Sequence, residues 1–309
     1  MKIFRNKDEI KNIPKTAVAL GFFDGVHVGH AELISETVAL AKEKGLMSAV
    51  FTFDEHPKNV MTHSDAVKRL VSAEDKLSLI EELGVDFCFV FSFADGFHEI
   101  SPGKFAKEYI SELFNAEDVF CGYNFHFGSR ASGDGAMLTA LGAEDGFNVH
   151  VHEPIMIDGQ TVSSSLIRGL VNEGSMEEAE KFLGRRFYLT GNVIEGNKIG
   201  RTIGFPTANI DMNLTISEPA FGVYITFVIW RDRSYPAVTN LGIAESVGRG
   251  TLFVESHILD FSESIYGEEI RVEFGERIRG EEKFPDIMAL VEQIGKDKET
   301  AIEWHRDNK

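Results

Sequence analysis

Residues 17–41 join an apolar run to a helical pattern through a glycine-rich turn that carries two histidines three residues apart. The run 17–20 is typical of a buried strand, and the apolar residues between Leu33 and Ala41 recur at helical spacing. The turn between them reads Gly-Phe-Phe-Asp-Gly-Val-His-Val-Gly-His over residues 21–30. A strand, a tight turn and a helix in this order predict an α/β unit.

The residue types in this turn favour binding of a triphosphate. Gly25 and Gly29 allow backbone to approach a ligand closely, and a helix start offers free N–H groups and partial positive charge. His27 and His30 lie about one helical turn apart and therefore face the same side. Two histidines that merely flank an ordinary turn are the alternative interpretation. The other residues of the turn that we expect to contact the nucleotide are Gly21, Phe22, Asp24 and Gly29.

Strand-like and helix-like segments continue to alternate up to residue 183. Nearly continuous apolar runs are typical of parallel strands that are buried on both faces. The alternation predicts a doubly wound parallel sheet, whose first strand–helix turn is a usual phosphate site. The segments expected are strands at 46–53, 86–91, 117–122 and 147–152, and helices at 73–83 and 102–114.

The pattern changes after Gly184 to short strands separated by turn residues, which predicts a small antiparallel β-barrel or sandwich. Helical turns at 175–183 link the two halves, so the expected domains are residues 1–183 and 184–309. The expected segments of the second domain are strands at 187–194, 223–230, 253–261 and 269–274, a helix at 284–294 and a further helix at 298–305.

Charge and cysteine content narrow the class of protein. The 309 residues carry a formal net charge of −18, which argues against nucleic acid or an anionic membrane as partner. The same charge would repel a triphosphate ligand, so we expect strict dependence on Mg²⁺. No apolar run approaches the roughly twenty residues of a membrane span, and the first residues lack the apolar core of a signal peptide. We therefore expect a cytoplasmic protein in which Cys88 and Cys121 are buried, reduced thiols.

A second candidate phosphate site is the serine run at residues 163–165, which opens a helical stretch. Ser163 and Ser164 can cap the backbone or donate to phosphate, and Arg168 follows about one turn later as a fork for phosphate oxygens. A simple helix cap is the alternative for the serines.

In the second half, residues 200–210 combine two glycines and a proline with a hydroxyl and an amide. Thr207 and Asn209 are two residues apart and face the same way in an extended segment. Their oxygens suit a hard cation such as Mg²⁺ on nucleotide phosphates. An ordinary turn is the alternative interpretation.

The motifs of the first half together resemble the adenylyltransferase half of bacterial bifunctional riboflavin kinase/FAD synthetases. The resemblance covers about residues 15–170 and depends on residues 21–30, 52–57, 122–128 and 163–168. It implies transfer of AMP from ATP to the phosphate of FMN, with His27 and His30 as catalytic residues. Asn124, where the family often has aspartate, becomes an expected ATP contact, together with Ser163, Ser164 and Arg168.

Residues 183–296 resemble the kinase half of the same family. The run 200–209 matches the riboflavin kinase signature for Mg-ATP, which implies nucleotide contacts from Gly200, Arg201 and Gly204 and a metal site at Thr207 and Asn209. Residues 255–261 match the strand that carries the catalytic base, which implies this role for Glu255. A solvated glutamate is the alternative there, and a surface ion cluster is the alternative for Arg279 and Glu281. The flavin contacts that the resemblance implies are Asn240, Arg279 and Glu281.

The resemblance therefore implies a transferase that phosphorylates riboflavin with ATP and then adenylylates FMN to FAD, releasing pyrophosphate. Residues 243–247 depart from the family pattern, so an adenylyltransferase with an inactive or weakened kinase domain is one alternative. A flavin-binding regulator without turnover is another, disfavoured by the intact motifs. The expected partners are ATP, riboflavin and FMN. The oligomeric state stays open, with a homo-oligomer among the alternatives.

Overall fold

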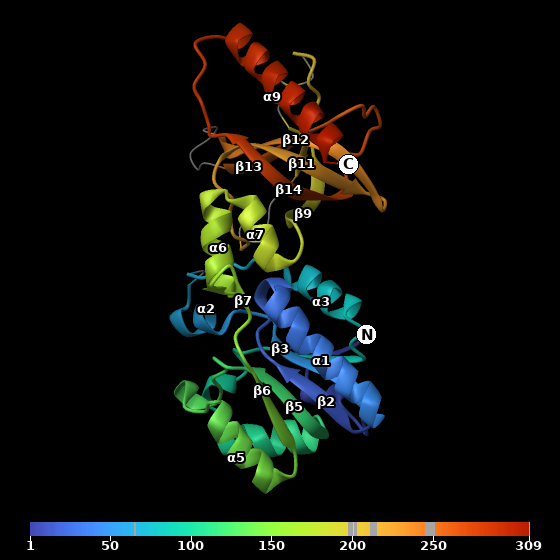
Figure 1. Cartoon of the computed structure of the whole chain (residues 1–309), viewed down its shortest axis with the longest axis vertical. Coiled ribbons are helices and arrows are strands. Elements are labelled where there is room, and N and C mark those ends of the chain that lie inside the picture. Colours follow the sequence, from blue (N-terminus) through green and yellow to red (C-terminus); the bar gives the residue numbers. More distant parts are fainter. Residues whose placement is uncertain (65, 197–199, 201–202, 211–214, 245–250, 309) are drawn as a thin grey trace. The chain divides into compact units, whose positions relative to one another are not determined.

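The computed structural model describes residues 1–64, 66–196, 200, 203–210, 215–244 and 251–308. The chain divides into two compact units, residues 1–164 and residues 165–309 (Figure 1). The domain boundary that we expect after residue 183 stays a prediction, although α6 (Ser164–Glu173) and α7 (Met176–Leu183) fall largely within the second unit. No helix in the described ranges is long and apolar enough to cross a membrane.

The first unit is built on a six-stranded parallel sheet, which confirms the expected doubly wound class. Its central strand, β2, is completely buried, as its apolar sequence predicts. The edge strand β1 is not among the expected elements, because three residues are too few to show a pattern. The strands lie in the order β1 (Lys2–Phe4), β4 (Phe87–Phe91), β3 (Met47–Phe53), β2 (Thr16–Leu20), β5 (Ala116–Gly122) and β6 (Asn148–His152).

Helices cover both faces of this sheet, and each face has its own apolar core. Val18 and Leu20 belong to one buried cluster, whereas Ala19 between them belongs to the other. The first cluster is rich in phenylalanine, and the rings of Phe89 and Phe114 stack with centroids 4.3 Å apart. The remaining elements of the unit are α1 (Val28–Lys44), α2 (Pro57–Thr62), α3 (Ala73–Glu82), α4 (Pro102–Lys104), α5 (Gly135–Asp145), β7 (Met156–Ile157) and β8 (Gln160–Thr161).

The helix expected at 102–114 begins as α4 but continues as a π-helix over Phe105–Leu113. Phe105, Ala106 and Ile110 are buried in it. The apolar positions therefore mark the segment correctly as helical, but their spacing does not reveal its wider turn.

The second unit contains a closed barrel of six strands, which decides between the barrel and the sandwich. Every neighbouring pair is antiparallel. Helix α7 packs against β9 and β14, and the C-terminal helix α9 (Ile287–Asp307) packs against β11 and β12. Around the barrel the order is β10 (Ala208–Ile210), β13 (Thr251–Ile258), β12 (Arg233–Ala244), β11 (Gly222–Trp230), β14 (Glu269–Arg279) and β9 (Phe187–Ile194).

The prediction of two separate C-terminal helices is wrong, because α9 runs unbroken from Ile287 to Asp307. Gly295 lies in its interior at a cost of about 1 kcal/mol relative to alanine. The contacts made beyond it offset this cost, since Asp297, Ala301 and His305 are all buried. Burial of these side chains against the barrel keeps the helix continuous.

Candidate functional sites

The histidine turn lies at the edge of the sheet where three neighbouring parallel strands end. Leu20 at the end of β2 pairs with Phe51 of β3 on one side and with Cys121 of β5 on the other. The turn 21–27 leaves this edge and leads directly into α1. This is the position in an open α/β sheet where ligands usually bind.

The backbone of the turn is strained. Phe23 has φ 55° and Val26 has φ 39°, which is the left-handed region that non-glycine residues rarely adopt. Gly25, with φ 78°, lies so close to Leu70 that a Cβ would come within 2.8 Å of that side chain. Such strain persists where surrounding contacts enforce it, and it concentrates at functional sites.

The two histidines lie together at the N-terminus of α1. The Nδ1 atom of His27 accepts a hydrogen bond from the backbone N–H of His30 at 3.2 Å, so His27 caps the helix. The imidazole rings stack with centroids 3.5 Å apart and an interplanar angle of 14°. Because Nδ1 of His27 is an acceptor, its neutral ring carries the proton on Nε2.

His30 is neutral at physiological pH. Burial, together with the nearby His27 and Lys76, holds its pKa well below the usual histidine range. Its Nδ1 is buried and has no hydrogen-bond partner among the described residues. A neutral ring with an unsatisfied polar atom is suited to hydrogen bonding with a ligand.

Asp24 joins the turn to two more distant segments. One carboxylate oxygen, Oδ1, accepts a hydrogen bond from the backbone N–H of Leu70 at 2.9 Å. The backbone carbonyl of Asp24 accepts a hydrogen bond from Oγ of Ser164 at 3.0 Å. The structure thus brings Ser164 to the histidine turn, and its predicted contact with phosphate stays a prediction. Ser163 immediately precedes α6, and the guanidinium of Arg168 within α6 donates to Oγ of Ser165 at 3.2 Å.

Asn124 is exposed and follows the end of β5, two residues beyond Gly122. Because β5 is the parallel neighbour of β2, Asn124 lies beyond the same edge of the sheet as the histidine turn. The backbone carbonyl of Asn124 contacts Nδ1 of His126 at 3.0 Å. Its amide side chain therefore stays a candidate ATP contact.

Sequence reasoning missed Lys76, whose side chain is only 4% exposed. The residue lies on α3 beside Leu77 and Ile80, on the buried face of the helix. Its Nζ donates to the carbonyl of Phe22 in the histidine turn at 3.2 Å. A lysine within the apolar stripe of an amphipathic helix is the signal that could have revealed it.

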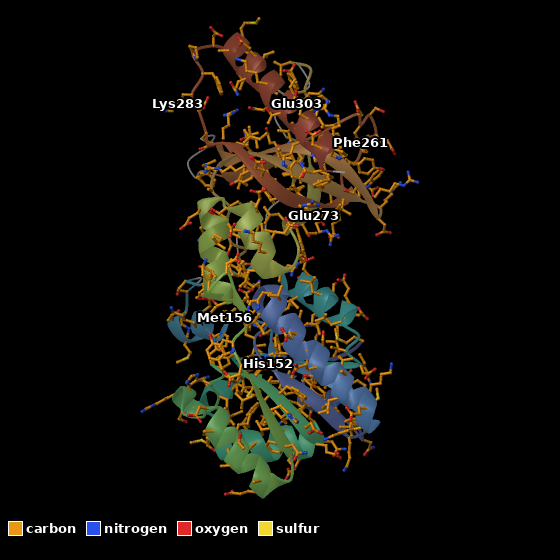
Figure 2. The ribbon with its side chains drawn as sticks, in the orientation of Figure 1. His152, Met156, Phe261, Glu273, Lys283 and Glu303 are labelled. Atoms are coloured by element: carbon orange, nitrogen blue, oxygen red, sulfur yellow. The ribbon has the colours of Figure 1, made fainter. Side chains whose placement is uncertain are left out.

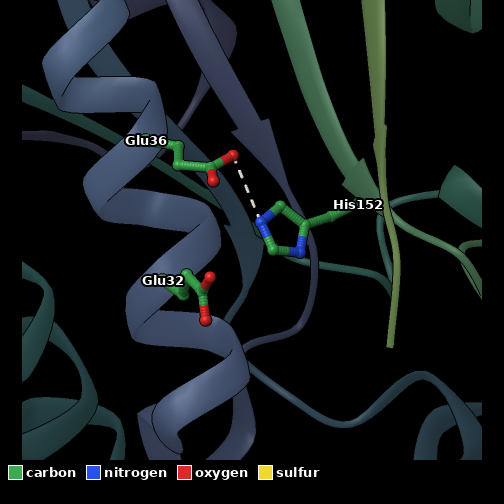
Figure 3. A group of neighbouring side chains, drawn as sticks. All are labelled: Glu32, Glu36 and His152. Atoms are coloured by element: carbon green, nitrogen blue, oxygen red, sulfur yellow. Dashed lines mark ion pairs between the residues drawn. The ribbon is translucent and has the colours of Figure 1, made fainter. Parts of the chain in front are cut away.

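A separate group of metal-ligand types, Glu32, Glu36 and His152, lies between α1 and the end of β6 (Figure 3). His152 Nε2 is 3.2 Å from a carboxylate oxygen of Glu36, and both glutamates are exposed. Figure 2 labels His152 among the side chains of the first unit. This ion pair ties β6 to α1, and we assign the group no catalytic role.

On the barrel, three predicted site residues lie in one row across adjacent strands. Glu255 of β13 is directly opposite Asn209 of β10 on one side and Asn240 of β12 on the other. Directly opposed residues point to the same face, with Cβ atoms about 4.5–5.5 Å apart. Val254 and Ser256, on either side of Glu255, are completely buried, so the row faces away from the barrel interior.

Glu255 faces outward but is only partly exposed, which differs from a freely solvated glutamate. Burial raises the pKa of its carboxyl group above the ordinary value. A raised pKa makes the ionised carboxylate a stronger base.

Thr207 and Asn209 offer oxygen ligands beside Glu255. The amide of Asn209 donates to Oγ1 of Thr207 at 3.4 Å, and Asn209 is 9% exposed. Gly196 makes room for this amide, since a Cβ there would lie 2.6 Å from its Nδ2. A hydroxyl, an amide and a carboxylate are the ligand types that Mg²⁺ prefers, so these residues fit the expected metal.

The loop before Thr207 is held by backbone contacts. The N–H of Phe205 donates to the carbonyl of Gly200 at 2.8 Å, and a Cβ at Gly200 would collide with the Phe205 carbonyl. His257 Nδ1 lies 2.8 Å from the carbonyl of Pro206, a contact that the sequence did not indicate. Gly204 has φ 90°, which favours glycine. Arg201 lies outside the described residues, as do residues 245–247 of the divergent loop.

Glu281 lies against the outer face of β12, because a Cβ on Gly242 would collide with its carboxylate. Gly242 is two residues from Asn240, so both share that face. Arg279 is instead engaged with α9, where it forms a hydrogen-bonded ion pair with Asp297 at 2.8 Å. Its guanidinium also lies 5.6 Å from the ring centre of Phe284.

We expect Asp297→Ala to destabilise the second unit by about 3–5 kcal/mol, because it leaves the half-buried Arg279 without its partner. Chemical unfolding followed by circular dichroism measures this loss. Glu292→Ala is the matched control, since it removes an exposed ion pair with Lys296 on the same helix. Equal free energies of unfolding for the two variants would contradict the expected stabilisation by the Arg279–Asp297 pair.

Two family models match the chain side by side. The model described as FAD synthetase matches residues 9–166, and the model described as riboflavin kinase matches residues 183–305. The two matches cover the units that carry the histidine turn and the Glu255 row, respectively.

Relatives similar to this chain match it along nearly its whole length. A bifunctional riboflavin kinase/FMN adenylyltransferase of Bacillus subtilis is 37% identical, with 94% of this chain and 92% of the relative covered. The Listeria monocytogenes protein of the same name is 38% identical, with 94% and 93% covered. A crystal structure described as a macrolide-efflux protein from Streptococcus pneumoniae is 29% identical, covers 98% of each chain and superposes with a TM-score of 0.89.

Proposed function

The chain belongs to the family of bifunctional riboflavin kinases/FMN adenylyltransferases, and we propose that each reaction uses the site built in one of its two units. The protein is a transferase that phosphorylates riboflavin and adenylylates FMN. The alternative of a degenerate kinase domain is not favoured, because both domains match their families. The stacked histidine pair on the sheet edge is the observation that carries the assignment of adenylyl transfer.

In the first unit, the phosphate of FMN attacks the α-phosphorus of ATP in line and pyrophosphate leaves. The attacking oxygen is already an anion, so positioning and charge stabilisation supply the catalysis. His27, His30 and backbone N–H groups at the start of α1 bind the phosphate oxygens, with Ser163 and Ser164 as further phosphate ligands. Arg168, which the motif at 163–168 assigns to the nucleotide, lies in α6 beyond the boundary of this unit. Gly21, Phe22, Asp24, Gly29 and Asn124 complete the proposed nucleotide site.

In the second unit, Glu255 accepts the proton of the riboflavin 5′-hydroxyl while the γ-phosphoryl group is transferred. The raised pKa of its carboxyl group suits this proton transfer. Thr207 and Asn209 would hold Mg²⁺, which neutralises charge on the nucleotide phosphates when bound. Gly200, Arg201 and Gly204 form the proposed nucleotide loop, and Asn240, Arg279 and Glu281 the proposed flavin contacts.

Incubation of the protein with riboflavin, ATP and Mg²⁺ tests both activities together. We expect FMN to form first and FAD to follow, with both products separated by chromatography. Replacement of Mg²⁺ by excess chelator should abolish both products, because the chain's net charge of −18 opposes ATP binding. Formation of FMN or FAD without divalent metal would contradict the proposed metal dependence.

A further inference from the structure

Lys76 is a buried cation at the adenylyl-transfer site that the mechanism above does not use. It is 4% exposed and lies on α3, which packs against the segment 24–26 of the histidine turn. Burying an ammonium group costs several kcal/mol unless its hydrogen-bond donors are satisfied. The hydrogen bonds that Lys76 makes therefore show which parts of the protein its burial stabilises.

All three donors of the Lys76 ammonium group are engaged by the protein. Nζ lies 3.2 Å from the carbonyl oxygen of Phe22, 3.1 Å from Oγ1 of Thr52 and 2.8 Å from the carbonyl oxygen of Phe53. Oγ1 of Thr52 in turn donates to the carbonyl of Phe22 at 2.8 Å. An ammonium group has three protons, so none is left for a substrate phosphate.

These bonds connect the histidine turn to the end of β3. Lys76 also lies 4.3 Å from the ring centre of Phe22, where its charge is attracted to the ring face. The next residue, Phe23, adopts the strained left-handed conformation and contacts the ring of His30 edge to face at 5.2 Å. A continuous set of contacts thus leads from Lys76 through Phe22 and Phe23 to the histidine pair.

We propose that Lys76 is a positioning residue for adenylyl transfer, which holds the strained turn so that His27 and His30 face the phosphates of ATP. The inference rests on the proposed assignment of this reaction to the histidine turn. Lys76 acts through the turn and touches neither substrate nor reacting atoms. A loss of its bonds would let Phe22 and Phe23 relax and would displace His30.

The charge state of Lys76 is sensitive to pH near the physiological range. Burial lowers the pKa of its ammonium group to about 8. Above that pH the neutral amine keeps two protons for three acceptors, and its lone pair faces an oxygen. The ionisable groups that surround it are Asp24, Asp54, Arg69, Cys88 and His30.

Steady-state kinetics of Lys76→Met test the inference. Methionine has a similar volume but no donor, so we expect kcat for FAD formation from supplied FMN to fall by about 10²-fold, the cost of a displacement near 1 Å. The KM for ATP should change much less, because Lys76 does not contact the nucleotide. Phosphorylation of riboflavin by the same sample should be unchanged, and circular dichroism during thermal unfolding reports whether the first unit is folded.

The pH profile separates positioning from a merely structural role. In the wild-type protein we expect the kcat of FAD formation to decline as pH rises through about 8. The Lys76→Arg variant should lack this decline, because the charge of arginine persists at that pH. Its kcat should also exceed that of Lys76→Met. The control is Lys44→Met, which removes an ion pair with buried Asp118 at the other end of α1 and should keep the wild-type profile.

The outcomes distinguish this inference from the function on which it rests. If Lys76→Met kept the wild-type kcat and its decline at alkaline pH, the positioning role of Lys76 would be refuted. The assignment of adenylyl transfer to the histidine turn would be unaffected. If His30→Ala left FAD formation intact, the assignment of the site itself would fail. A folded Lys76→Met variant that loses FAD formation, with Lys76→Arg restoring part of it, supports the proposal.

Discussion

His30→Ala should lower FAD formation from FMN and ATP by about 10²–10³-fold, or about 2.7–4 kcal/mol of barrier, while FMN formation from riboflavin stays at the wild-type rate. The expected loss is large because the ring of His30 is already in place before ATP binds. It stacks on His27 at 3.5 Å and contacts Phe23. A group fixed in this way stabilises transition-state charge without having to reorganise.

The assay supplies riboflavin and FMN in separate reactions and quantifies both products by chromatography. His98→Ala is the matched control, since it removes an exposed histidine from the same unit. A parallel fall of both activities in folded His30→Ala protein would contradict the assignment of one reaction to each unit. Loss of FAD formation in His98→Ala as well would show that the assay reports general damage.

Glu255→Gln should lower riboflavin phosphorylation by about 10²–10⁴-fold, the usual contribution of a general base, and leave adenylylation of supplied FMN unchanged. Glutamine keeps the size of the side chain and its place between Asn209 and Asn240, but it cannot accept the hydroxyl proton. Retained phosphorylation in this variant would exclude Glu255 as the base.

The pH dependence of the wild-type kinase adds a second measurement on the same residue. Burial raises the pKa of the Glu255 carboxyl group, so the catalytically competent carboxylate is lost on acidification earlier than for an exposed glutamate. The kinase rate should therefore fall as pH drops, already above the ordinary titration range of a glutamate. Glu269→Gln, at an exposed position on β14, is the control and should keep the wild-type rate and profile.

The sequence predicted the central strands of the first unit well because they are buried on both faces. In β2 and β3 every interior residue is apolar or a small hydroxyl residue, and such runs stand out from their surroundings. Strand β12 was harder to anticipate, since Pro236 and several polar residues interrupt its pattern. Its partners β11 and β13 supply the pairing that overrides the local signal.

The candidate sites show the same division between local and long-range information. His27 and His30 are neighbours in sequence, so their spacing was enough to predict that they face the same side, although it did not predict the cap of His27 on His30. The row formed by Asn209, Glu255 and Asn240 depends on the register of three strands that lie far apart in the chain. For Lys76, its place in the apolar stripe of α3 indicates burial, but its contact with Phe22 depends on the packing of α3 against the turn and cannot be predicted from the local pattern.

The closed barrel also constrains how copies of this protein can associate. Each of its strands has hydrogen-bonded neighbours on both sides, so the ring presents no open border to which an incoming chain could add a further strand. The sheet of the first unit, in contrast, ends at β1 and β6. Among the strands in the described ranges, borders open to strand addition are therefore found at β1 and β6 and at the short pair β7–β8, not around the barrel.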